Sequence, residues 1–559
     1  MKKFLIVTIF IAAVFLGIIT RFYKLGEAPA GLYIDEAGQG YNAYSILKTG
    51  RDEFGKSFPI VFRSFIDFKT PVYIYLVVPF IPIFDLTSFT VRLPSLIFSV
   101  LTLPILFLLL KRISPPKIAT SLALLTTLLM AISPWHVVFG RTNFECNVAL
   151  FFFLAGVYFL YKGTQKPIWL LLSALMFAIA IPSYHSQRIV TPLIALLLFL
   201  RYKKSLLLSE RRPFLAIAIL IGFLVSLPTL SIAPTSGFLA RASGLNIFSH
   251  SRQMPAGFIE NYNGPLEFIV NSSAFLSTWE FASLYVSYFS PRNMFILGDS
   301  GFRDSYPELA TFFMWQFPFY IYGLFILVKR KNLGELRFFT IALILVSPIA
   351  GALTRDPYAT IRALPLVVPQ LVIISLGMIG FWEKLSMYKQ HTSKLRVGAV
   401  SVLFVLVIYS VAKLYSSAII LNEQFRGFYW DYGWEEVANV MKNEFDPTLP
   451  VVVDNTRFEP YSQIAFFLKY PPEKYQQENY EVPLSEYYTN MQRNRTKRIG
   501  NITTRAISWK EDLLTEQYLI GDGLAISHKQ IKEHKLKLIH EVFYPDGIVA
   551  YRIVKTMNK

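Results

Sequence analysis

The stretch FTVRLPSLIFSVLTLPILFLLLKRISPPK, residues 89–117, indicates the fold class of this chain. It begins with an apolar run long enough to cross a hydrocarbon core of about 30 Å and ends in a short loop rich in Lys and Arg. Similar runs recur along the 559 residues, and the mean hydropathy of the whole chain is +0.42. The sequence therefore predicts a polytopic α-helical membrane protein.

We expect eleven membrane spans, each formed by one apolar run. They cover residues 4–20, 88–110, 118–134, 143–162, 167–183, 187–202, 212–231, 309–328, 337–353, 362–382 and 395–415. The first run has the basic start of a signal peptide, but ITRFYKLG, which follows it, contains no small-residue cleavage motif. An uncleaved first helix is therefore expected.

The basic loops give this topology its orientation. They are residues 111–117, 161–166, 201–212, 329–337 and 383–396. If the N terminus is cytoplasmic, all five loops are cytoplasmic too, as the positive-inside rule requires. The apolar segment 71–84 has about 14 residues and three prolines, and counting it as a span would place these loops outside. We therefore expect it to be re-entrant or interfacial.

The extracytoplasmic parts are then a first outer loop (21–87), a large outer loop (232–308), shorter loops around 135–142, at 184–186 and at 353–362, and everything after the last span. We expect residues 1–415 to form the membrane domain and residues 416–559 a soluble domain. That domain shows a helical pattern at 434–445 and strand patterns at 449–455 and 547–554, which are typical of a small α/β or α+β fold.

Charge and cysteine content exclude other classes. The net charge of +18 comes largely from the loops between spans, so it indicates membrane orientation rather than nucleic-acid binding. Cys146 is the only cysteine, which excludes an intramolecular disulfide and a CxxC metal site.

Polar residues that are unusual for a membrane protein all map to the outer side of this topology. Ionisable groups at membrane depth are costly and by default mark functional sites. The candidates are Asp35, Glu36, Lys69, His136, Arg141, Glu145, Tyr184, His185, Arg188, Asp299, Arg303, Arg355, Asp356 and Arg362.

Structural roles are the alternatives for several of these candidates. Asp35 can cap a helix that starts near Ala37, and Glu145 can pair with Arg141 one helical turn away. Asp299 and Arg303 can form a local pair. His185 can be an interfacial hydrogen-bonding residue, and Arg188 and Arg362 can anchor helix ends to lipid headgroups. Convergence on one side favours function, because independent anchors would be found on both sides.

This mixture of groups suits transfer from a lipid phosphate. A carboxylate near the membrane surface can deprotonate a hydroxyl, and a neighbouring Lys or Arg can hold a phosphate. A sugar carried on a lipid phosphate would meet both groups at that depth.

The same segments resemble a known family. DEAGQGYNAYSILKTGRDEFG, FKTPVYIYL and FTVRLPSLIFSVLTLPILFLLLKR are similar to the start of GT-C membrane glycosyltransferases, in particular the protein O-mannosyltransferase-like enzymes and the lipid A aminoarabinose transferases. SPWHVVFGRTNFECNVALFF, YHSQRIVTPL and TRDPYATIRALPLVVPQL continue the likeness to about residue 385.

The resemblance implies an inverting hexosyl- or pentosyltransferase with a polyprenyl-phosphate donor and an outer catalytic site. It also implies an integral protein of a prokaryotic cytoplasmic membrane whose acceptor is a protein or a lipid. Asp35 matches the acidic base of the family's first outer loop, and Glu36 follows it in the same motif. Lys69 matches the basic position associated with the lipid phosphate. Glu145 falls where relatives carry Asp, so its role is not fixed by the match.

On this hypothesis Asp35 takes the proton of the acceptor hydroxyl in a single displacement at the anomeric carbon. Lys69, with Arg188 or Arg362, offsets charge on the departing phosphate. Glu145 orients Arg141 or the acceptor, and Tyr184, His185, Asp299, Arg303 and Arg355 are candidate substrate contacts. Asp35, Glu36 and Glu145 are the hard oxygen ligands that a divalent metal would take, but no spacing requires one, so we expect no obligatory cofactor.

A transporter or lipid flippase is the alternative from another class. Transporters place charges near mid-span and often contain inverted repeats. Here the charges lie at span ends, no repeat is visible and a soluble domain follows, so the transferase is the preferred hypothesis.

Overall fold

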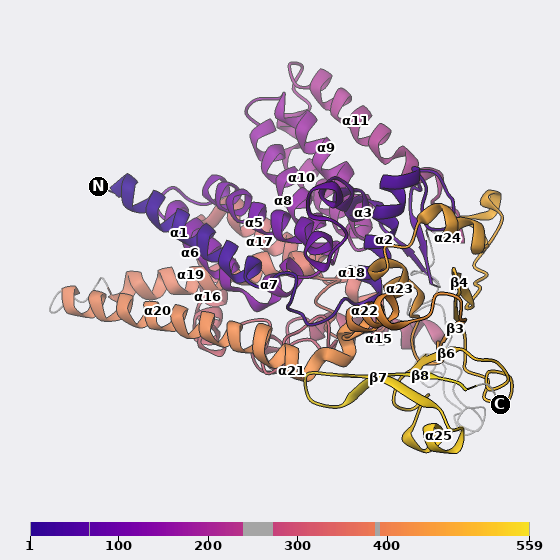
Figure 1. The fold of residues 1–559 in the computed structure, drawn as a ribbon. Coiled ribbons are helices and arrows are strands. Elements are labelled where there is room, and N and C mark those ends of the chain that lie inside the picture. Colours follow the sequence, from indigo (N-terminus) through magenta and orange to yellow (C-terminus); the bar gives the residue numbers. More distant parts are fainter. Residues whose placement is uncertain (1, 66, 237, 239–271, 386–391, 558–559) are drawn as a thin grey trace, which may run out of the picture.

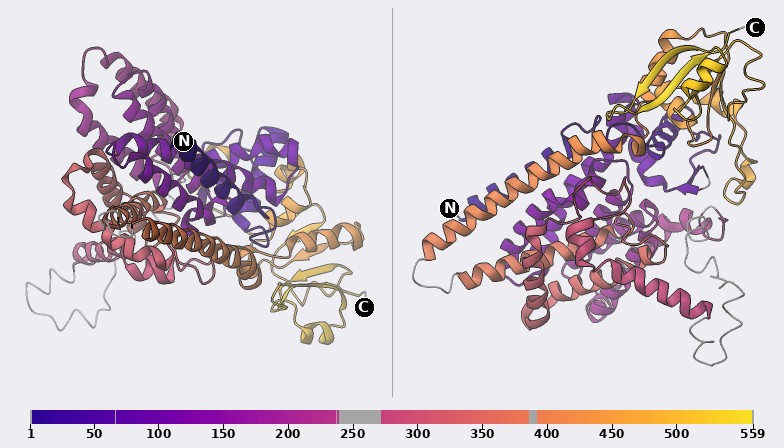
Figure 2. Two further views of the ribbon diagram at one scale, coloured as in Figure 1. Left: turned by 90° about the vertical axis from the view of Figure 1, so that its left-hand side faces the viewer. Right: turned by 90° about the horizontal axis from the view of Figure 1, so that it is seen from below.

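The computed structural model describes residues 2–65, 67–236, 238, 272–385 and 392–557. A bundle of long helices carries a smaller domain with a β-sheet at one end, and the N terminus lies at the opposite end (Figures 1 and 2). Residues 239–271 of the predicted large outer loop and residues 386–391 of the last basic loop are outside the described residues.

Each of the eleven predicted spans contains a helix. These helices are α1 (Lys2–Phe22), α5 (Ser88–Ile113), α6 (Ala119–Ile132), α8 (Cys146–Gly163), α9 (Trp169–Ser183), α10 (Gln187–Leu206), α11 (Arg212–Ser231), α16 (Phe317–Lys329), α17 (Gly334–Val346), α19 (Val367–Leu385) and α20 (Thr392–Tyr415). Among the described residues, seven helices are long and apolar enough to cross a membrane, or eight if the bent pair α6 and α7 (Pro134–Gly140) is one span. The count of eleven stays a prediction, since α9, for example, has only 15 residues.

The surfaces of these helices fit a lipid environment. The central span Leu364–Leu385 is 94% buried, whereas Arg212–Ser231 and Val397–Trp430 are only 11% buried despite being apolar. An apolar helix with so little protein around it is stable only where its exposed face meets lipid. In the centre, α16 and α19 pack closely because Gly323 faces the carbonyl of Ile373: a Cβ at that glycine would lie 1.8 Å from the oxygen.

The first outer loop is largely ordered. It forms α2 (Ile34–Thr49) and a hairpin of β1 (Phe62–Ser64) and β2 (Asp67–Lys69). The apolar segment 71–84 then breaks into α3 (Pro71–Val77), η1 (Val78–Phe80) and α4 (Ile81–Phe84), each with a proline in its first turn. Together these pieces are shorter than a span, as predicted.

Short elements connect the bundle. They are α15 (Ser273–Ser287), η2 (Asn293–Leu297), η3 (Met314–Gln316), η4 (Lys331–Leu333), α18 (Ile349–Ala352), η5 (Leu364–Leu366), η6 (Ser416–Leu421), α21 (Asn422–Arg426) and η7 (Gly427–Trp430). The last three continue α20, so the final span runs on as a helix beyond residue 415 to Trp430.

The C-terminal part is a mixed α/β domain. Its six-stranded sheet has the order β4 (Lys497–Ile499), β5 (Ile502–Thr504), β3 (Val451–Val453), β6 (Tyr518–Gly521), β8 (Val549–Lys555) and β7 (Lys537–Phe543). Its helices are α22 (Trp434–Glu444), α23 (Tyr461–Phe467), α24 (Pro472–Glu478), η8 (Leu484–Glu486) and α25 (His528–Glu533). β3 is parallel to β5 and β6, and the other pairs are antiparallel. The predicted helix and both predicted strands correspond to α22, β3 and β8.

Helix α2 joins this domain to the bundle. It packs against α23 on one side and against α5 and α3 on the other. Gly40 permits the approach, since a Cβ there would lie 2.6 Å from the Phe466 ring and 2.7 Å from Val91. Because α2 is held from both sides, residues at its N-terminus have fixed positions.

Candidate active site

Asp35 and Lys69 meet at the beginning of α2. The Lys69 Nζ lies 2.7 Å from Asp35 Oδ2, and the two side chains are 9% and 21% exposed, respectively. Asp35 is the second residue of α2 and not its N-cap, which is Tyr33, so the capping alternative is wrong. The structure thus brings together the predicted base and the predicted phosphate-binding cation from positions 34 residues apart.

The segment after Lys69 connects this pair to the turn between α9 and α10. Thr70 Oγ1 donates to the carbonyl of Ser183, 3.0 Å away. Tyr184 and His185 follow in that turn, with ring centroids 6.2 Å apart. Arg188, in the first turn of α10, donates to the carbonyl of Phe238 at 2.9 Å. The candidates of this turn therefore lie on the same side of the molecule as Asp35.

Glu36 is buried and bound on both oxygens. Its Oε1 accepts from Arg92 Nε (3.0 Å) and from the Asn143 N–H (2.9 Å). Its Oε2 accepts from Arg92 Nη2 (2.8 Å) and from the Tyr33 N–H (3.3 Å). Only 1% of Glu36 and none of Arg92 is exposed. This geometry makes Glu36 a fixed anchor for the start of α2, one residue after the candidate base.

Two buried arginines hold the chain that leads into α2. Arg92 also donates to the carbonyls of Leu25, Pro29 and Gly31. Arg141 donates to carbonyls between residues 20 and 28, including that of Ala28 at 3.0 Å. These bonds join the chain before α2 to α5 and to the turn between α7 and α8.

Glu145 lies next to the middle of α2. It immediately precedes α8, is 7% exposed, and its Oε1 accepts a hydrogen bond from Gln39 Nε2 at 3.0 Å. Glu36 and Gln39 are three residues apart, so they lie on the same face of α2. Glu145 is therefore positioned by the helix that carries Asp35.

Arg303 and Asp299, the two candidates from the segment before α16, lie in different surroundings. Arg303 places its guanidinium 3.8 Å from the ring centroid of Tyr33, two residues before Asp35. Asp299, in contrast, accepts from the Thr360 N–H (2.6 Å) and hydroxyl (2.7 Å), and burial raises its pKa. The two residues have different partners, so the alternative in which they pair with each other is not supported.

Both arginines of the loop between α18 and η5 already have partners. Arg362 pairs with Asp356 and donates to the Thr354 hydroxyl at 2.6 Å. Arg355 lies 3.6 Å from Glu280. The phosphate-binding role of Arg362 and the substrate role of Arg355 stay predictions.

Two buried carboxylates were not among the predicted site residues, and one of them, Asp431, contacts the start of α2. Asp431 accepts from the Ile34 N–H at the start of α2 (2.8 Å) and from Gln463 (3.1 Å), and burial raises its pKa to about 7. Burial and the neighbouring Asp299 likewise raise the pKa of Asp304 to about 7. Asp431 follows the last span by one residue of sequence, and no local pattern relates it to a position 397 residues earlier.

His136 is buried away from Asp35 and contacts Arg21 instead. It is fully buried in α7, and its Nδ1 lies 2.8 Å from Arg21 Nη2. Within the described ranges, no three His, Cys, Asp or Glu side chains are grouped so as to hold a metal ion, and this includes Asp35, Glu36 and Glu145.

Comparison with known proteins adds to this geometry. Residues 68–232 match the family model described as dolichyl-phosphate-mannose-protein mannosyltransferase. No curated protein matches the chain.

Solved structures with the same architecture include ArnT from Cupriavidus metallidurans bound to undecaprenyl phosphate. The TM-score is 0.53 at 12% identity, with 100% of this chain and 98% of that chain covered. The archaeal oligosaccharyltransferase AglB from Archaeoglobus fulgidus, in complex with an inhibitory peptide and a dolichol-phosphate, gives 0.51 at 12% identity, covering 98% of this chain and 74% of that chain. These matches confirm the predicted class: the chain has the GT-C fold of membrane glycosyltransferases, and its residues 68–232 match the mannosyltransferase family model.

Proposed function

We propose that the protein transfers a sugar from a polyprenyl-phosphate donor to a hydroxyl acceptor at the extracytoplasmic face of the membrane. The observation that carries this proposal is the contact between Asp35 and Lys69, which pairs a proton acceptor with a cation at the start of a rigidly held helix. The similar structures named above contain undecaprenyl phosphate or a dolichol-phosphate, which supports a lipid-phosphate donor.

The reaction is one displacement. Asp35 takes the proton of the acceptor hydroxyl while that oxygen forms a bond to the anomeric carbon of the sugar. The bond between the anomeric carbon and the phosphate oxygen breaks, and the lipid phosphate leaves with the electron pair. A general base contributes typically 10²–10⁴-fold to such a step.

In this proposal Lys69 stabilises the leaving group. The negative charge of the phosphate grows as the sugar departs, and a preorganised cation stabilises that state more than the ground state. Thr70, next to Lys69, donates a hydrogen bond to the carbonyl of Ser183, which begins the turn that leads to Arg188. We therefore assign Arg188 as the second cation at the phosphate. Glu36, Arg92 and Asp431 keep the base in position and do not take part in the chemistry.

The proposal is tested by transfer itself. The purified full-length protein in lipid nanodiscs is given radiolabelled polyprenyl-phosphate sugars, one sugar at a time, and a membrane extract as acceptor. We expect label from at least one donor to move to the acceptor fraction. If every donor remained intact although the protein was folded, the proposal would be wrong.

A further inference from the structure

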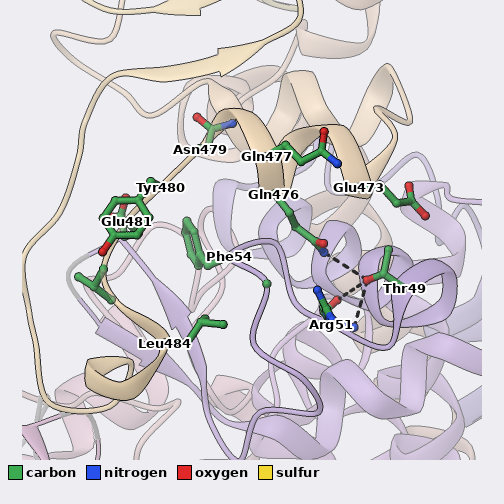
Figure 3. A pocket seen from close by; sticks show the side chains of 12 residues that line it. Thr49, Arg51, Phe54, Glu473, Gln476, Gln477, Asn479, Tyr480, Glu481 and Leu484 are labelled. Atoms are coloured by element: carbon green, nitrogen blue, oxygen red, sulfur yellow. Dashed lines mark hydrogen bonds between the residues drawn. The ribbon is translucent and has the colours of Figure 1, made fainter.

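A hollow lies at the C-terminal end of α2, between that helix and the C-terminal domain. It encloses about 520 Å³, and its walls come from the first outer loop and from residues 473–484 (Figure 3). Small-molecule sites commonly have volumes of roughly 300–1,000 Å³. Thr49, on its wall, follows Asp35 by 14 residues of helix, which is about 21 Å at 1.5 Å per residue. The hollow is therefore separate from the candidate active site.

The frame of this pocket is rigid. The Gln476 amide donates to the hydroxyls of Ser45 and Thr49 and to the carbonyl of Asp52, at 2.9–3.2 Å. Asn479, 6% exposed, accepts from the N–H of Arg498 (2.9 Å) and donates to its carbonyl (2.7 Å). These bonds connect the first outer loop to the pocket wall and the wall to β4, so the pocket has a defined shape without a ligand.

Other polar groups in the wall remain available. Across the described part of the chain, the Arg51 guanidinium, the Glu473 carboxylate and the Gln477 amide form no hydrogen bond or ion pair. One cation, one anion and one amide together favour a ligand that is itself uncharged and offers both donors and acceptors. A phosphate or a carboxylate would be attracted by Arg51 but repelled by Glu473.

Aromatic rings complete the lining. Phe54 and Tyr480 both face the hollow, and Tyr480 is 69% exposed (Figure 3). Rings of this kind pack against flat apolar faces and leave the edges of the ligand to polar groups.

We propose that this pocket binds a neutral saccharide, with one sugar ring stacked on Tyr480 and the hydroxyls of the saccharide bonded to Arg51, Glu473 and Gln477. Sugar rings have an apolar C–H face and a rim of hydroxyls, which matches both parts of the lining. A peptide fits less well, because an extended peptide would bind by pairing with the neighbouring edge strand β4. The N–H and the carbonyl of Arg498 in that strand are already hydrogen-bonded to Asn479. The site is independent of Asp35 and of the proposed transfer reaction.

Binding, not activity, tests this proposal. The full-length protein is reconstituted in nanodiscs free of glycosidic detergent, because a maltoside headgroup would compete. Tetrasaccharides of mannose, glucose and N-acetylglucosamine are titrated by saturation-transfer NMR and calorimetry. We expect at least one of them to bind. Tyr480→Ala and Glu473→Gln are each expected to raise its Kd about tenfold, equivalent to about 1.4 kcal/mol.

The matched control is Phe543→Ala. Phe543 is also an exposed aromatic residue (47%), but it ends β7 at the opposite edge of the sheet. This variant should bind as the wild type does, and all variants should keep the wild-type thermal midpoint. Binding of none of the three sugars, or equal loss in Tyr480→Ala and Phe543→Ala, would overturn the proposal. The proposal would also be overturned if the sugars did not bind, whereas a pool of hydroxyl-rich peptides bound to the wild type and not to Tyr480→Ala.

Discussion

Replacing Glu36 by Gln should destabilise the protein strongly, although the change removes only a charge. The carboxylate accepts four hydrogen bonds, two of them from Arg92, and the pair is 1% and 0% exposed. Glutamine has one acceptor oxygen, so its NH₂ group must face two of these four donors, and Arg92 stays charged without a counterion. Breaking a buried pair in this way costs about 3–5 kcal/mol.

The effect is measured as the thermal midpoint and as a double-mutant cycle with Arg92→Met. The two changes should not be additive: the loss in the double variant should be smaller than the sum of the two single losses, because either single change already breaks the pair. Glu27→Gln is the control: Glu27 pairs with Lys24 at 3.4 Å but is 72% exposed, and such surface pairs contribute about 0–1 kcal/mol. If Glu36→Gln and Glu27→Gln lowered the midpoint equally, the assigned role of Glu36 would be refuted.

Three further predictions concern the donor, the pH dependence and the orientation. Lys69→Met should lower kcat/KM for the lipid-phosphate donor about 10²-fold or more, with partial activity in Lys69→Arg; unchanged kcat/KM would exclude its role at the phosphate. Burial raises the pKa of Asp431 from 3.8 to about 7, so the folded protein binds this proton more tightly than the unfolded chain does. The stabilisation that results is complete below pH 3.8 and is lost as the pH rises to about 7. Wild-type stability should therefore fall more between about pH 5 and about pH 8 than that of Asp431→Asn, and equal slopes would contradict this. Alkaline phosphatase fused after Lys559 should be active, and a GFP fusion there dark; the opposite pattern would place the C-terminal domain in the cytoplasm.

The sequence was sufficient for the fold class because membrane spans and basic loops are local signals. Each predicted span contains a helix, and the predicted elements of the C-terminal domain match α22, β3 and β8. It also grouped Asp35 with Lys69, since both precede the second span on the same side. Strands β4 to β7 were not predicted, because a short strand forms only through pairing with other strands, and some of these lie far away in the sequence.

The supporting residues could not be found in this way. Arg92 lies in the first turns of a span, where an arginine is expected to reach toward headgroups, and only the folded structure shows it bound to Glu36. Asp431 meets the start of α2 from a distant part of the chain. The sequence also did not reveal that Glu36, adjacent to the candidate base, is enclosed while Asp35 is 21% exposed; that difference depends on tertiary packing.

The central claim is that Asp35 is the base, and the most direct measurement is single-turnover transfer by Asp35→Asn with a donor that supports wild-type transfer. The variant should still fold with one cooperative thermal transition, bind the lipid-phosphate donor, and transfer sugar at least about 10²-fold more slowly. Transfer at the wild-type rate by this variant would contradict the account.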